Sequence, residues 1–96
     1  MILQIFSIYD TKAESFNPPV YLTSPGLAIR SFSDSVQNPE SQFAQHPEDY
    51  TLFQIGSWDD QTSKFELLST PKSLHVAIEF VSPTHPLNNQ FLKTEE

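Results

Sequence analysis

The chain has 96 residues, no cysteine and a formal net charge of −7. A chain of this length buries somewhat over about 60% of its unfolded surface, which leaves room for one small core and excludes two globular domains. The absence of cysteine excludes disulfides and thiolate metal sites. Twelve carboxylates against five cations also oppose any nucleic-acid binding that depends on overall charge.

The first predicted element is a central strand at residues 2–9. Its apolar side chains occupy both faces, with Phe6 and Ile8 on one face and Ile5 and Tyr9 on the other. A strand that is apolar on both sides has two faces to bury. The rest of the fold must therefore supply cover for both.

Prolines predict a loop at residues 10–19, because proline has no N–H for a strand ladder, and residues 20–22 could add a short extended edge. A helix is predicted at residues 25–37. Ser24 can cap its first turn, and Pro25 costs no hydrogen bond at the first helical position. One apolar stripe of this helix can lie on a sheet: Leu27, Ala28, Phe32 and Val36.

Two more strands are predicted at residues 51–58 and 64–68. The polar loop at residues 59–63 joins them and is rich in turn-forming residues. This pattern indicates a β-hairpin.

The segment after this hairpin is harder to interpret. Thr70-Pro71 repeats the helix-entry signal and predicts a short helix at residues 71–77, although the alternation of Val76 and Ile78 also fits a strand. Residues 82–96 offer little to bury and are predicted to form a mobile tail.

Together these elements predict an α+β fold, with a small three-stranded, mainly antiparallel sheet, one main helix on one face and a second short helix. Residues 1–81 would form a single domain. The second face of the first strand needs a cover, either the segment after Pro71 or a second copy of the chain. The aromatic-rich strands favour the second copy, so we expect a homo-oligomer built on the sheet or its edge.

No catalytic or metal-binding constellation is recognisable in the sequence. The three histidines lack the short spacings that place imidazoles on one zinc ion. The acidic pairs at residues 48–49 and 59–60 are typical of solvated turns, and the serines lie outside any nucleophile motif. Two glycines cannot build a phosphate-binding loop. We therefore expect no enzyme activity, no metal ion and no cofactor.

The run from His46 to Tyr50 is the most distinctive local motif. Its side chains could form a polar recognition edge at a strand entrance, but proline and aspartate ordinarily end and cap turns, and we favour that structural interpretation. Trp58 is likewise more typical of a half-buried sheet aromatic than of a base-stacking platform.

Three separated blocks resemble the small nonstructural protein of gokushoviruses, which are microviruses with circular single-stranded DNA genomes. The blocks are IFSIYDTKAESF at residues 5–16, AIRSFSDSV at 28–36 and HPEDYTLFQIGSWDD at 46–60. In that family the protein is described as DNA-binding and is likened to microvirus protein C. The resemblance implies that it moves the replication complex from duplex synthesis toward single-strand synthesis and packaging in the host cytoplasm.

The resemblance thus implies a nonstructural accessory of viral DNA replication and viral genome packaging that binds single-stranded DNA, the replication complex or the procapsid. Single-strand binding needs aromatic rings near a few cations. The nearest candidates are Lys12, Arg30, Tyr50, Trp58 and Lys64. The alternative is an acidic protein–protein interaction module without direct nucleic-acid binding, which would use its acidic surface and an exposed apolar sheet face.

Overall fold

The computed structural model describes residues 1–81, and the predicted tail at residues 82–96 lies outside them. The strands are β1 (Ile2–Asp10), β2 (Ser15–Phe16), β3 (Val20–Leu22), β4 (Tyr50–Asp59) and β5 (Lys64–Val76). The helical segments are α1 (Pro25–Gln37), α2 (Gln42–Gln45) and the 3-10 helices η1 (Pro47–Asp49) and η2 (Ala77–Phe80). In this part of the chain no helix is long and apolar enough to cross a membrane.

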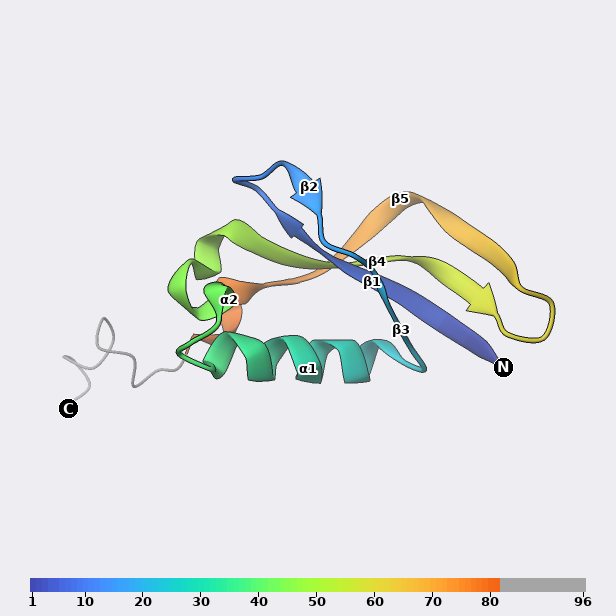
Figure 1. Ribbon diagram of the computed structural model, residues 1–96, viewed down its shortest axis with the longest axis horizontal. Helices are drawn as coiled ribbons and strands as arrows, with labels where there is room; N and C mark the ends of the chain where they lie inside the picture. The colour runs from blue at the N-terminus through green and yellow to red at the C-terminus, as the bar shows by residue number, and fades with distance from the viewer. Residues whose placement is uncertain (82–96) are drawn as a thin grey trace, which may run out of the picture.

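The five strands form one antiparallel sheet in the order β2-β1-β4-β5, and β3 also pairs with β1. β1 and β4 pair from Ile2 opposite Asp59 to Asp10 opposite Tyr50, with one register shift: Ile5 pairs with Gly56 and Phe6 with Gln54. Figure 1 shows α1 along one side of this sheet, with the β4–β5 hairpin reaching beyond the helix.

The predicted fold class is wrong in its main feature. The sheet has five strands instead of three, and it curls into a half-barrel with two small helices. β2 lies in the segment predicted as a loop, and β3 coincides with the short extended edge considered at residues 20–22. They are two and three residues long, so hydrophobic alternation has few positions in which to reveal them. The helix at residues 25–37 is confirmed.

The main core lies between the sheet and α1. The Oγ of Ser24 accepts a hydrogen bond from the N–H of Leu27 at 3.3 Å and so caps the helix. The apolar stripe of the helix then packs on the sheet, in a cluster of buried residues made of Phe6, Ala28, Phe32, Val36, Tyr50, Leu52 and Ala77. Phe43 of α2 and Phe80 of η2 pack against this cluster, so both helices and η2 lie on one side of the sheet.

The short helix predicted at residues 71–77 is also wrong. β5 continues to Val76 because, after an irregular stretch, it pairs with β4 again, with Lys72 opposite Gln54 and Val76 opposite Thr51. Pro71 falls between the two paired stretches, where no ladder hydrogen bond is required of it. The segment does not cover the second face of β1, because η2 packs on the α1 side instead.

The sheet curls sharply at Gly56, where β5 passes close to β4. A Cβ at this position would lie 2.6 Å from the carbonyl oxygen of Glu66 and 2.9 Å from the Cα of Leu67, so only glycine allows the approach. β3 and β5 would be about 14 Å apart in a flat sheet, at three strand spacings. The ring centroids of Tyr21 and Phe65 are nevertheless 6.5 Å apart. The face opposite α1 is therefore concave at this end.

The two faces of the sheet differ in their charged and aromatic strand residues. By strand register, the charged strand residues all lie on the α1 side: Asp10, Asp59, Lys64, Glu66 and Lys72. The concave face carries six aromatic side chains instead: Tyr9, Phe16, Tyr21, Phe53, Trp58 and Phe65. Within residues 1–81 no helix packs on this aromatic face.

Replacing Gly56 with alanine should destabilise the protein by about 1–3 kcal/mol, because the new methyl group meets backbone atoms that cannot move aside. Urea denaturation followed by circular dichroism measures the change. Gly26→Ala is the matched control: the nearest atom to its added Cβ is 3.9 Å away, and the position lies in α1. Equal stability of the two variants would contradict the role of Gly56 in the curl.

Glu79 should make the folded state sensitive to acid. The backbone N–H of Val76 donates to its carboxylate at 3.0 Å and the Nδ1 of His75 lies 2.7 Å away, and these contacts lower the pKa of Glu79. A carboxylate with a lowered pKa stabilises the folded state at pH values above the usual glutamate pKa of about 4.3. This contribution is lost as the pH falls through the folded-state pKa.

The difference in unfolding free energy between wild type and Glu79→Gln should therefore shrink as the pH falls below the usual glutamate pKa and through the folded-state pKa of Glu79. Urea titrations at a series of acidic pH values measure it. A difference that stays constant with pH would show that the carboxylate charge does not contribute.

Candidate functional site

Three aromatic rings meet at the hairpin end of the concave face. Tyr21, Trp58 and Phe65 come from β3, β4 and β5, and we call them the hairpin trio. Their ring centroids are 5.9 Å (Tyr21–Trp58), 6.2 Å (Trp58–Phe65) and 6.5 Å (Tyr21–Phe65) apart. With Ser63 they border an open hollow of about 440 Å³. Tyr21 is 41% exposed and Phe65 52%, so both present ring surface to a ligand.

A second group of rings lies at the other end of the same face. Tyr9, Phe16 and Phe53 have centroids 4.8 Å (Tyr9–Phe16), 5.6 Å (Phe16–Phe53) and 6.4 Å (Tyr9–Phe53) apart. Phe16 is 44% exposed, whereas Tyr9 and Phe53 are half-buried. Tight mutual packing of these rings makes this group mainly a small second core.

The charges around the hairpin trio nearly balance. The N-terminal ammonium donates a hydrogen bond to the Oδ1 of Asp60 at 2.8 Å, which raises the pKa of that ammonium. Lys64 directly precedes Phe65, while Asp59 and Glu66 carry the remaining charges of the paired strand ends. The hollow thus offers aromatic contact surface and little net charge.

The structure brings only two of the five sequence-predicted residues together. Trp58 lines the hollow, and Lys64 adjoins it at the start of β5, although by register Lys64 lies on the α1 side of the sheet. Tyr50 is 6% exposed and stacks edge-on against a core phenylalanine, so its ring has no free face. Burial raises the pKa of the Tyr50 phenol, and nearby Asp10 and Asp49 raise it further.

The other two predicted residues lie elsewhere. Lys12 is exposed in the turn after β1, and Arg30 is exposed on α1, which covers the opposite face of the sheet. Neither adds positive charge to the hairpin trio.

Sequence reasoning missed Tyr21 and Phe65. For Phe65 the sequence indicated the hairpin but not the register: the predicted five-residue loop at 59–63 would place Lys64 opposite Trp58, whereas the observed loop at 60–63 places Phe65 there. The sequence indicated a possible short extended edge at residues 20–22 but not its partner strand, because β3 joins the sheet through only three pairs with β1.

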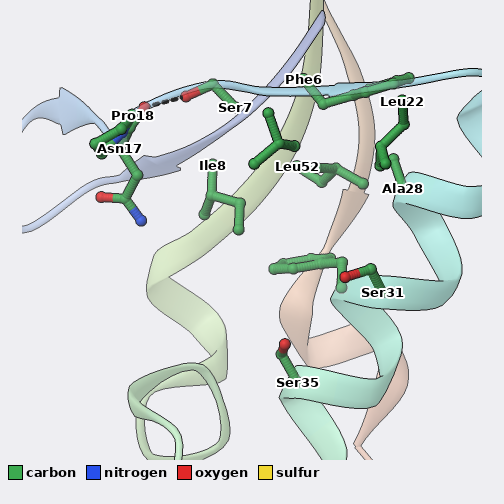
Figure 2. A pocket seen from close by; sticks show the side chains of 12 residues that line it. Phe6, Ser7, Ile8, Asn17, Pro18, Leu22, Ala28, Ser31, Ser35 and Leu52 are labelled. Carbon is green, nitrogen blue, oxygen red and sulfur yellow. Dashed lines mark hydrogen bonds between the residues drawn. The ribbon is translucent and has the colours of Figure 1, made fainter. Parts of the chain in front are cut away.

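A smaller cavity of about 110 Å³ lies between α1 and β1. Figure 2 shows that its walls combine core side chains such as Ile8 and Leu22 with the hydroxyls of Ser31 and Ser35. The Oγ of Ser7 donates a hydrogen bond to the carbonyl oxygen of Asn17 at 2.6 Å beside it. No titratable side chain lines the cavity, so its own walls supply no acid–base catalyst.

The turn before β4 gathers His46, Glu48 and Asp49, whose ligand atoms lie within 4.8 Å of one another. The sequence marked the run from His46 to Tyr50 as a possible recognition edge, but the spacing of the histidines did not indicate a metal-ligand group. Its residues are mostly exposed, and the carbonyl oxygen of Asp49 accepts hydrogen bonds from the backbone N–H of Thr11 at 3.0 Å and from its Oγ1 at 3.2 Å. The turn is thus anchored by its backbone, as expected of a strand entrance.

Comparison with known proteins identifies the family. The model of the family described as Phage ORF5 protein matches residues 3–80, which span all five strands and α1. Neither the curated proteins nor the solved structures include a match to the chain. Because the family model covers most of the chain, the protein belongs to the Phage ORF5 protein family.

Proposed function

We propose that this phage protein is a nonenzymatic, nonstructural accessory of genome replication and packaging in a phage with a single-stranded DNA genome. It acts in the host cytoplasm by binding unpaired bases of that DNA on the hairpin trio, within the replication complex. Membership of a phage family and the three-block resemblance to the gokushovirus protein support the biological role.

The observation that carries the binding mode is the open hollow bordered by Tyr21, Trp58 and Phe65. Bases of single-stranded DNA stack on exposed aromatic rings, and each stacked base contributes about 1–3 kcal/mol. The faces of these bases are buried in duplex DNA. The hollow therefore favours single strands.

The charge distribution sets a limit on this binding. Of the two lysines in the β4–β5 hairpin, Lys64 adjoins the hairpin trio and Lys72 pairs with Gln54 away from it, and the chain as a whole carries a net charge of −7. Each phosphate neutralised on a single strand contributes about 0.7 to the salt slope. Binding should therefore depend on salt with a slope near or below about 1, far less than in a basic DNA-binding protein.

A protein-interaction module is the second candidate. The concave face carries no charged strand residue, and an uncharged aromatic surface suits a protein partner in the replication complex or procapsid as well as it suits bases. Under this alternative the chain would have no affinity for isolated DNA.

Trp58 is the single tryptophan, so its fluorescence reports on the hollow directly. Titration with a short oligothymidylate at low salt should quench this fluorescence, and duplex DNA of equal length should not. Phe65→Ala should weaken oligonucleotide binding by about 5- to 100-fold, the equivalent of losing one stacked base.

Phe16→Ala is the matched control, because it removes a similarly exposed ring at the other end of the face. An equal loss of affinity in both variants would place the site elsewhere on the concave face. An unchanged fluorescence at every oligonucleotide concentration, with no shift of a labelled oligonucleotide, would refute direct DNA binding and leave the protein-interaction module.

A further inference from the structure

The outer edge of β5 is the longest free strand edge in residues 1–81. β5 runs for 13 residues, pairs with β4 on one side and ends the strand order on the other. Its first ten residues are all exposed. A free strand edge presents unpaired N–H and C=O groups that can pair with another chain.

Exposed apolar side chains concentrate on this edge. Phe65, Leu67 and Leu68 are 52%, 69% and 43% exposed, and they fall within four consecutive residues. Isolated exposed apolar residues are ordinary, but a cluster on a free edge is typical of a surface that meets a partner.

The order of charges identifies the partner as a second copy. Lys64, Phe65 and Glu66 are consecutive, and an antiparallel strand related by a twofold axis at Phe65 reverses their order. Lys64 of each copy then lies opposite Glu66 of the other, on the same face of the joined sheet. Within residues 1–81 neither Lys64 nor Glu66 forms a salt bridge.

The same axis places the two Phe65 rings opposite each other on the concave face. Directly opposed aromatic pairs and opposite-charge pairs are the combinations that stabilise neighbouring antiparallel strands. A basic or a polar partner strand would satisfy only one part of this pattern.

We propose that two copies of this protein pair through the outer edges of β5 around a twofold axis at Phe65. Because β5 begins at Lys64, the paired stretch is residues 64–66 of each copy, and the junction contains two Lys64–Glu66 pairs and the two Phe65 rings. The pairing joins the two sheets into one. It also sets the two hairpin hollows side by side on a continuous concave face. This inference concerns the free protein and stands independently of what the hollow binds.

Charge reversal at the two positions tests the register. Lys64→Glu and Glu66→Lys should each shift wild-type dimers toward monomers in sedimentation equilibrium at micromolar concentrations, because each creates two like-charge contacts across the axis. The double variant K64E/E66K should recover the dimer. The two single changes move the net charge in opposite directions, so a loss in both cannot result from overall charge.

Lys72→Glu is the matched control, since it makes the same charge change on β5 away from the axis, and its mass should equal that of the wild type. Circular dichroism checks the fold of each variant. A wild-type mass that stays near 10.9 kDa as concentration rises would overturn the proposal. So would a dimer that neither single variant weakens, or a double variant that remains monomeric although folded.

Discussion

The close approach of β5 to β4 at Gly56 is the constraint on which the shape of this protein depends. A side chain at that position would collide with backbone atoms of Glu66 and Leu67. The approach bends the hairpin inward, and rings from strands that are not neighbours in the sheet come into contact. Ile5, opposite Gly56 in the register, is 2% exposed as a result.

The curl of the sheet helps to bury the second apolar face of β1. On the α1 side, the helical segments bury Phe6 and its neighbours in the usual way. On the other side the sheet covers part of itself, because aromatic side chains from outer strands reach over β1. Large rings are suited to this, since each can cover more area than an aliphatic side chain. The cover is incomplete, and the rings that stay exposed are the ones available for binding.

Charged and aromatic strand residues lie on opposite faces of the sheet, and the proposed binding mode depends on that separation. The strand carboxylates and lysines lie on the α1 side, while the concave face holds rings, aliphatic side chains such as Ile5 and Leu67, and small polar groups. A ligand on the concave face is therefore selected by flat apolar contact more than by charge. The proposed binding to DNA is compatible with a net charge of −7 for this reason, because it does not depend on a basic patch.

The sequence by itself determined the elements whose signals are local. Ser24-Pro25 and the stripe of α1 define that helix, and the alternation around Thr51–Trp58 defines β4, because capping and periodicity act over a few neighbouring residues. Only the tertiary structure decided the conformation of residues 71–76, which form a strand with β4 although their sequence carries a helix-entry signal. It also decided the composition of the site: Tyr50 enters the core, while Tyr21 joins Trp58 and Phe65. Those outcomes depend on strand order, on the register of β3 and on the curl at Gly56, which arise from contacts between residues far apart in the chain.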